Sequence, residues 1–221
     1  MIFAAYSQGF FPMAPKGGSL DVDWVMPEIR GILPIKDIHI PRSLLKTLKK
    51  KSFDVSVDKA FEQVIHACAK TKTGREETWI NTKIIDAYIE THRAGFAHSI
   101  EVWKEGFLIG GLYGLRIGGA FFGESMFSKR PNASKVALIH LAARLFKGGF
   151  TLLDAQFPND HLEQFGCFEQ KHNDYIEDLN EAMAIDANFY PPEFAAGEEI
   201  DEVLSSEALL DFFLQSRTQM S

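Results

Sequence analysis

The 221-residue sequence lacks any apolar run long enough to cross a membrane and contains only two cysteines. A membrane-spanning helix needs about 20 consecutive apolar residues, so we expect no membrane partner. Cys68 and Cys167 lie far apart and form no metal-type pair. The first residues lack the basic stretch and apolar core of a secretory signal. These absences favour a reduced, cytoplasmic setting.

Basic residues are outnumbered by acids, but the imbalance is concentrated near the C-terminus. The net charge is −7, and the segment from residue 189 to the end contributes −6, which leaves −1 for residues 1–188. A nearly neutral body can still carry a basic face that meets phosphates. Candidates for such a face are Arg42, Lys46, Lys49, Lys50, Lys51, Lys70, Lys72 and Arg75. A solvated helix surface explains the same residues equally well.

The acidic tail, residues 191–221, has apolar residues at helical spacing, namely Ile200, Val203, Leu204, Leu210 and Leu214. This pattern predicts a helix over residues 199–215 that docks on the body, because a helix of that length is marginal alone. Its charge would repel the phosphates of a nucleic acid, so we expect it to lie away from the path of an RNA. The alternative is that it covers the basic residues 46–51 and competes with RNA.

Hydrophobic periodicity divides the rest of the chain into a small lobe and a main domain. Residues 1–35 are rich in glycine, proline and aromatic residues and predict an irregular lobe. Within residues 36–190, three strands at 98–103, 107–115 and 120–126 are separated by short turns, which indicates an antiparallel meander. Further strands are predicted at 53–57 and 150–156. Helices are predicted at 43–51, 58–69 (capped by Asp58), 81–94 (capped by Asn81), 132–148, 160–165 and 173–183. This order is typical of an α+β, acetyltransferase-like (GNAT-like) domain with a mainly antiparallel sheet.

The loop between the meander and the next helix lacks glycine. Acetyl-CoA enzymes of this fold hold the pyrophosphate with a Gly-rich loop at that place, whereas residues 127–134 read FSKRPNAS. The fold is therefore compatible with an acyl donor other than acetyl-CoA.

Two polar residues, Asp154 and Gln156, end the predicted buried strand and should face the same side of it. An acid beside an amide is suited to orienting an amine, because the amide oxygen accepts an N–H and the carboxylate fixes the geometry. The alternative is that Asp154 caps the next helix and Gln156 bonds the backbone, and the residues alone favour this alternative.

Glu124 lies in an apolar strand, where a carboxylate is costly unless it is paired. A ligand ammonium or Lys135 would serve equally as its partner. Trp79, in a loop before a helix, could stack on a nucleobase or fold over the core. Tyr6 and Met13 belong to an aromatic-rich N-terminal set with the same two interpretations. His98 and His140 have no companions at ligand spacing, and we interpret both as structural.

Taken together, eight segments resemble the bacterial leucyl/phenylalanyl-tRNA–protein transferases in content and order. They are AYSQGFFPM (5–13), WVMPEIRGI (24–32), TWI (78–80), HSIEVW (98–103), GGLYG (110–114), GESMFS (123–128), NASK (132–135) and LDAQ (153–156). The resemblance implies an enzyme that moves Leu, Phe or Met from aminoacyl-tRNA to proteins beginning with Arg or Lys, marking them for degradation. It also implies a cytoplasmic protein, expected to be a monomer, that works without a cofactor.

The resemblance also assigns roles to residues. Asp154 and Gln156 would assist the transfer, Trp79 and Met13 would hold the terminal adenosine, and Tyr6 would belong to the substrate-binding set. The amino-acid pocket would be formed by Leu112, Phe121, Glu124, Leu138, Leu141 and Leu153. The chain departs from the family at position 13, where some relatives have Trp. We also expect that its N-terminal lobe is shortened relative to the family or that the true start lies upstream. The competing interpretations are a small-molecule N-acetyltransferase, against which the missing glycine loop argues, and a non-catalytic RNA-binding module.

Overall fold

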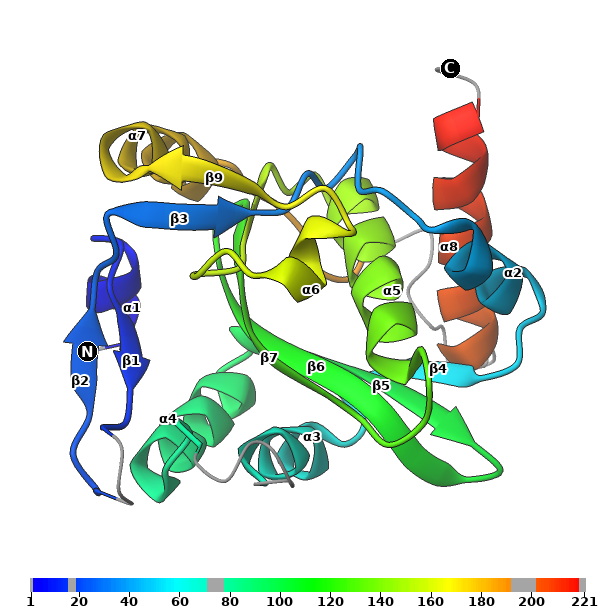
Figure 1. The fold of residues 1–221 in the computed structure, drawn as a ribbon, viewed down its shortest axis with the longest axis horizontal. Coiled ribbons are helices and arrows are strands. Elements are labelled where there is room, and N and C mark those ends of the chain that lie inside the picture. Colours follow the sequence, from blue (N-terminus) through cyan, green and yellow to red (C-terminus); the bar gives the residue numbers. More distant parts are fainter. Residues whose placement is uncertain (1, 16–18, 71–77, 192–201, 219–221) are drawn as a thin grey trace.

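A seven-stranded mixed sheet, in the order β4-β5-β6-β7-β8-β3-β9, forms the centre of the protein (Figure 1). The computed structural model describes residues 2–15, 19–70, 78–191 and 202–218. The strands are β1 (Phe11–Met13), β2 (Asp23–Val25), β3 (Ile29–Ile32), β4 (Asp54–Val57), β5 (Ala97–Lys104), β6 (Phe107–Ile117), β7 (Ala120–Ser128), β8 (Leu152–Asp154) and β9 (Phe168–Lys171). The helices are α1 (Ile2–Tyr6), α2 (Arg42–Lys49), α3 (Phe61–Ala69), α4 (Thr82–Arg93), α5 (Ala133–Lys147), α6 (Asp160–Glu163), α7 (His172–Met183) and α8 (Glu202–Thr218).

The predicted meander is confirmed as β5, β6 and β7, which pair antiparallel in chain order. Glu105 and Gly106 both have positive φ at the β5–β6 turn, as a tight hairpin turn requires. After α5 the chain returns as β8, which pairs parallel with β7, while the other neighbouring pairs in this sheet are antiparallel. The predicted α+β class and its mainly antiparallel sheet are therefore confirmed, with the acetyltransferase-like order of meander, helix and parallel strand.

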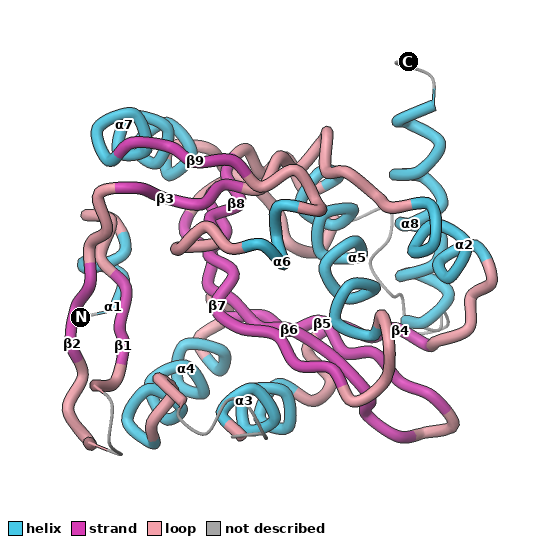
Figure 2. The backbone as a smooth tube through the Cα atoms, in the orientation of Figure 1, coloured by secondary structure: helices cyan, strands magenta, loops and turns pink. Residues whose placement is uncertain are grey.

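The sheet has apolar layers on both faces because successive side chains of a strand point to opposite sides. Leu112 and Phe121 pack on the face covered by α5, whereas Tyr113 and Phe122 pack on the face covered by α3 and α4. Figure 2 shows these helices on opposite sides of the central strands. Helix α5 is buried along almost its whole length, which explains its nearly uninterrupted apolar sequence.

The N-terminal lobe contributes more to the main domain than its irregular sequence suggests. Strands β1 and β2 form a separate two-stranded sheet, but β3 lies in the large sheet between β8 and β9. Tyr6 and Phe11 are buried in the same core cluster as the α3 and α4 side chains. The division of the chain at residue 35 therefore stays a prediction, while β3 belongs structurally with the main sheet.

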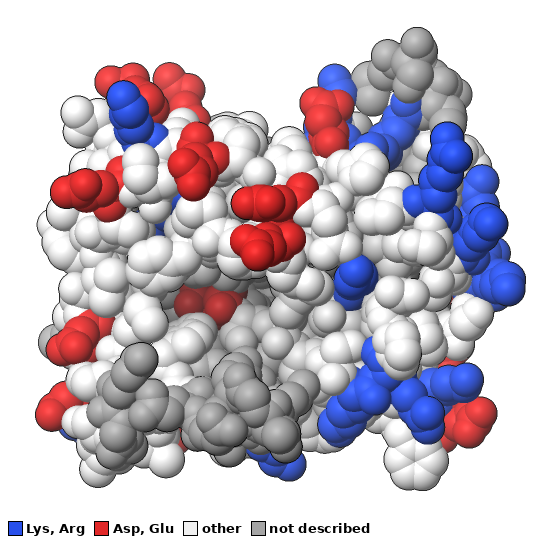
Figure 3. Space-filling view, viewed as in Figure 1, with Lys and Arg blue, Asp and Glu red and all other residues white. Residues whose placement is uncertain are grey.

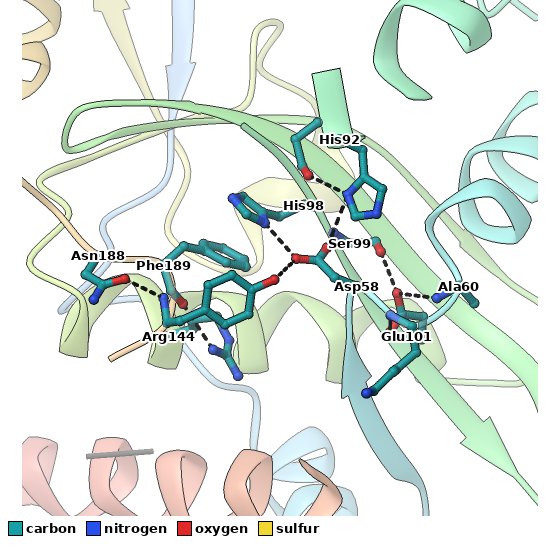
Figure 4. Close-up of polar contacts among 12 residues, drawn as sticks. Asp58, Ala60, His92, His98, Ser99, Glu101, Arg144, Asn188 and Phe189 are labelled. Carbon is teal, nitrogen blue, oxygen red and sulfur yellow. Dashed lines mark hydrogen bonds and ion pairs between the residues drawn. The ribbon is translucent and has the colours of Figure 1, made fainter. Parts of the chain in front are cut away.

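Asp58 does not cap the helix that follows it, which corrects the sequence prediction. Helix α3 begins at Phe61, and Ala60 occupies the N-cap position without a side-chain hydrogen bond. Asp58 instead has a left-handed backbone with φ of 58°. Its carboxylate accepts the main-chain N–H of Ser99 at 2.7 Å and lies 2.7 Å from Nδ1 of His98 (Figure 4). By contrast, Asn81 caps α4 as predicted, because its side chain accepts the N–H of Ile84 at 3.0 Å.

The acidic tail forms helix α8 and docks on α5 and β4, as expected of a helix too short to be stable alone. Its buried side chains include Leu209 and Phe213, which the predicted stripe omitted, besides the predicted Leu210. Ile200 and the side chains of Val203 and Leu204 lie outside the described residues.

Helix α8 docks near the basic residues 46–51, which is the position that the sequence analysis gave as the alternative. Lys51 Nζ lies 2.9 Å from Glu207 Oε2 and 3.2 Å from Asp211 Oδ2, so α8 sits against Lys51, one of the basic residues that follow α2. Figure 3 shows lysine and arginine side chains gathered on the edge of the molecule where α2 lies. Of the other basic candidates, Lys72 and Arg75 lie outside the described residues.

Within the described parts of the chain, no helix combines the length and the apolar character needed to span a membrane.

Candidate active site

A cavity of about 220 Å³ opens where β7 and β8 separate. The parallel pairing ends at Phe122 and Asp154, while β7 continues alongside β6 as far as Ser128. The space between the two strands has apolar walls and a polar rim, and Figure 3 shows a hollow in which acidic side-chain atoms are recessed. The apolar walls include Leu33, Leu112, Met126, Leu138, Leu141, Leu153 and Leu162, and the polar lining includes Glu124, Asp154, Gln156, Asn159 and His161.

Asp154 is fully buried at the end of β8 and has three polar neighbours. Its Oδ2 accepts the Tyr175 hydroxyl at 2.8 Å and lies 3.3 Å from Nε of Arg30. Its Oδ1 accepts the main-chain N–H of Gln156 at 2.8 Å. Burial raises the pKa of this carboxyl, and the nearby Arg30 guanidinium opposes that rise. Asp154 caps no helix, since Asn159 provides the N-cap of α6.

Gln156 lies two residues beyond Asp154, past the end of the strand, with a left-handed backbone at φ of 58°. Asp154 and Gln156 therefore face the same side because of this turn, and not because side chains alternate along a strand. Its side-chain Nε2 donates to Oε1 of Glu124 at 3.1 Å, so the amide group bonds a side chain rather than the backbone. Asp154 and Gln156 line the same cavity.

Glu124 is buried and lies at the cavity. Besides Gln156, it accepts the hydroxyl of Tyr6 at 2.7 Å on the same oxygen. Burial raises the pKa of Glu124 to about 8, although the Tyr6 and Tyr88 hydroxyls oppose that rise. Lys135 is not its partner, because Nζ of Lys135 donates to Gln164 Oε1 at 2.6 Å.

A second hollow, of about 170 Å³, adjoins the first and shares Glu124 and Gln156 with it. Phe11, Met13, Trp79 and Phe157 provide its apolar surface. Trp79 and Met13, which are far apart in sequence, are therefore brought together next to the catalytic candidates. Trp79 is partly exposed at this hollow and also packs against the core cluster that contains Tyr6 and Phe11, so both interpretations of this residue find support.

The remaining candidates divide into three groups. Leu112, Leu138, Leu141 and Leu153 form part of the cavity wall. Phe121 is not among the lining residues, because its ring stacks on Phe189 in the core with centroids 5.7 Å apart. Tyr6 is fully buried, and its hydroxyl contacts both Glu124 and the hydroxyl of Tyr88. It therefore holds Glu124 in place and does not line the cavity itself.

A sequence model of a family described as leucyl/phenylalanyl-tRNA protein transferase matches residues 32–180. The chain belongs to this family. A leucyl/phenylalanyl-tRNA–protein transferase of Paramagnetospirillum magneticum is 51% identical over 86% of this chain and 90% of its own length. That of Rhizorhabdus wittichii is 52% identical over 84% of this chain and 75% of its own length.

Membership of the leucyl/phenylalanyl-tRNA protein transferase family makes the chain an enzyme, an aminoacyl-tRNA–protein transferase. Among solved structures, a GCN5-related N-acetyltransferase-like protein from Streptococcus suis matches with a TM-score of 0.30 and 12% identity. The match covers 73% of this chain and 59% of that one. A match with so low a TM-score does not support a fold assignment, so the fold class rests on the strand order described above.

Sequence reasoning missed two residues of this candidate site, Arg30 and Tyr175. Both contact Asp154, yet they lie in β3 and α7, far from it along the chain. Arg30 lies in one of the segments that carry the family resemblance (24–32), and this was the sequence signal that could have indicated its place in the site. Tyr175 lies in a helix whose buried face also carries Leu179 and Ala182, so its sequence pattern indicates only core packing.

Proposed function

We propose that this transferase moves Leu, Phe or Met from aminoacyl-tRNA to the α-amine of proteins that begin with Arg or Lys, and so marks them for degradation. We further propose that it acts in the cytoplasm as a monomer without a cofactor. The observation that carries the proposal is the apolar cavity that ends at Glu124, Asp154 and Gln156 and adjoins the hollow of Trp79 and Met13.

The size and walls of the cavity suit an apolar amino-acid side chain. A cavity of about 150 Å³ accommodates benzene, and this one measures about 220 Å³. Its leucine and methionine walls are flexible and offer no polar partner, which favours Leu, Phe and Met over polar residues. One methyl group is worth about 1–3 kcal/mol in such a pocket, so we expect only partial rejection of side chains branched at Cβ.

The adjoining hollow suits the 3′ adenosine that carries the amino acid. The indole of Trp79 provides a flat face for a base, and stacking of this kind is worth about 1–3 kcal/mol. Since the two hollows share Glu124 and Gln156, the ester that joins amino acid and ribose would lie over these side chains.

The acceptor amine would approach from the side of α6. Asn159 and His161 of this segment line the cavity, and its Asp160 and Glu163 are exposed beside them. Acidic side chains at the entrance favour a peptide whose first residue is basic, and such attraction weakens with salt.

The reaction joins the amine nitrogen to the ester carbonyl carbon and breaks the bond from that carbon to the ribose oxygen. An α-amine has a pKa of about 7.7–8.0, so a useful fraction is neutral near pH 7. The Gln156 oxygen would accept one N–H and direct the nitrogen, since its Nε2 is already engaged with Glu124. The pKa of Glu124, about 8, is close to that of the amine, so the ionised fraction of Glu124 can take the proton that the nitrogen loses and pass it to the departing ribose oxygen. Much of the rate enhancement would come from holding both substrates together.

The test mixes purified protein with Leu-tRNA, Val-tRNA or acetyl-CoA and peptides beginning with Arg or Gly. We expect transfer from Leu-tRNA to the Arg peptide, slower transfer from Val-tRNA, and none from acetyl-CoA. Acetylation of the peptide from acetyl-CoA, without transfer from Leu-tRNA, would replace this proposal with the acetyltransferase alternative. Equal rates with the Arg and Gly peptides would contradict the proposed acceptor.

A further inference from the structure

Asp154 is held on one oxygen by two side chains that reach it from distant elements. The hydroxyl of Tyr175, on α7, donates to Oδ2 at 2.8 Å, and Nε of Arg30, on β3, lies 3.3 Å from the same atom. Arg30 Nη2 also donates to the Tyr175 hydroxyl at 2.9 Å, so the three groups form a closed cluster. Both Arg30 and Tyr175 are buried, and the guanidinium lies over the Tyr175 ring with its carbon 4.3 Å from the centroid.

The other oxygen of Asp154 holds the backbone of Gln156. Oδ1 accepts the Gln156 N–H at 2.8 Å, at a residue whose φ is 58°. A residue with a side chain disfavours this left-handed region by about 1–2 kcal/mol, so the conformation needs support from its surroundings. The same conformation directs the Gln156 side chain to Glu124, 3.1 Å away.

We propose that Tyr175 and Arg30 are positioning residues for aminoacyl transfer, which act through Asp154 on the backbone of Gln156. They fix the Asp154 carboxylate so that its Oδ1 keeps Gln156 in the left-handed conformation and its amide over the cavity. The inference rests on the proposed function of Gln156 in directing the amine. It gives Tyr175 a part that its place in a core helix does not reveal.

Arg30 extends this arrangement to the neighbouring hollow. Its Nη2 donates to the carbonyl oxygen of Gly9 at 2.7 Å, and its guanidinium carbon lies 5.1 Å from the ring centroid of Phe11. Phe11 lines the hollow that contains Trp79. Replacement of Arg30 would therefore disturb two places at once, and Tyr175 offers the cleaner variant.

The test is Tyr175→Phe, which removes the hydroxyl and keeps the ring beneath Arg30. We expect the kcat of transfer from Leu-tRNA to fall about tenfold, as the loss of a hydrogen bond to a charged group predicts. The KM for Leu-tRNA should stay unchanged, because neither Tyr175 nor its hydroxyl lines a hollow. Tyr190→Phe is the matched control, since it removes a hydroxyl that bonds a different carboxylate, that of Asp58, and it should keep the wild-type kcat.

A double variant distinguishes positioning from a general loss of stability. If Tyr175 acts through Gln156, then adding Tyr175→Phe to Gln156→Ala should lower kcat by less than about twofold, since the two effects are not additive. An unchanged kcat in Tyr175→Phe, or a full tenfold loss in the Gln156→Ala background, would overturn the inference.

Amide hydrogen exchange of Gln156 gives an outcome that does not depend on activity. The exchange should become faster in Tyr175→Phe and stay unchanged in Tyr190→Phe, because only the first variant loosens Asp154. Equal exchange in wild type and Tyr175→Phe would refute positioning even if the wild type transferred nothing. A wild type without transfer activity would refute the proposed function instead.

Discussion

Replacement of Glu124 by Gln should make the protein more stable at alkaline pH. Glu124 is buried, and its pKa is raised from the ordinary 4.5 to about 8. The folded protein thus binds this proton more tightly than the unfolded chain does. The free energy of unfolding of the wild type therefore falls as the pH rises from about 4.5 to about 8.

The magnitude follows from the two pKa values. Each factor of ten in proton affinity corresponds to about 1.4 kcal/mol, so ionised Glu124 destabilises the fold by at most about 5 kcal/mol above pH 8. Gln keeps the shape and keeps an oxygen that can accept from Tyr6 and Gln156, but it carries no charge. Below pH 5 the two proteins should therefore differ little, and at pH 9 the variant should be more stable by several kcal/mol.

The assay is urea unfolding of wild type and Glu124→Gln at intervals between pH 5 and pH 9. The difference matters more than either curve, because Asp154 and Glu101 also have raised pKa values owing to burial and contribute slopes of the same sign to both proteins. Glu62→Gln, at an exposed glutamate of α3, is the control and should follow the wild-type curve. If the difference between wild type and Glu124→Gln stays constant across this range, the reasoning from burial is refuted.

Three further predictions concern the chemistry and the surface. Asp154→Asn should lower kcat in transfer assays while the KM for Leu-tRNA is unchanged; full activity would exclude Asp154 from the reaction. Trp79→Ala should weaken binding of an aminoacyl-adenosine analogue, measured by calorimetry, more than Met13→Ala does, because an indole stacks and a thioether does not; the opposite order would reverse the assignment. Glu207→Gln combined with Asp211→Asn should raise the affinity for charged tRNA at low salt but not at high salt, because two acids near the basic residues are removed; an unchanged affinity at low salt would place the RNA path elsewhere.

The sequence predicted the parts of the fold that depend on local patterns. The meander was predicted because its strands alternate regularly and are joined by tight turns, and α5 because a long apolar segment ends at Gly148. Strands β3 and β9 were missed. Each has four residues, and each is held by partners that lie far away along the chain. Pairing of that kind leaves no periodic signal in a short window.

The site shows the same division between local and distant information. Asp154 and Gln156 were found from a short motif at the end of a strand, although the turn that brings them together was not. The partners of Glu124 were not found, because Tyr6 is separated from it by 118 positions. The nearer candidate, Lys135, bonds Gln164 instead. Contacts across such separations depend on the packing of complete elements, which a single sequence does not display.

From the position of β3 between β8 and β9, we infer at which stage of synthesis the enzyme can become active. The meander and α5 contact one another over short stretches of chain, so they can fold as soon as they are made. The hydrogen bond from Arg30 to Tyr175, in contrast, cannot form until Tyr175 has been synthesised, 145 positions later. Domains generally fold as their chains emerge from the ribosome. A nascent or prematurely ended chain that stops before α7 therefore contains most of the cavity wall but lacks the support of Asp154, so we expect truncated products to be inert rather than unregulated transferases.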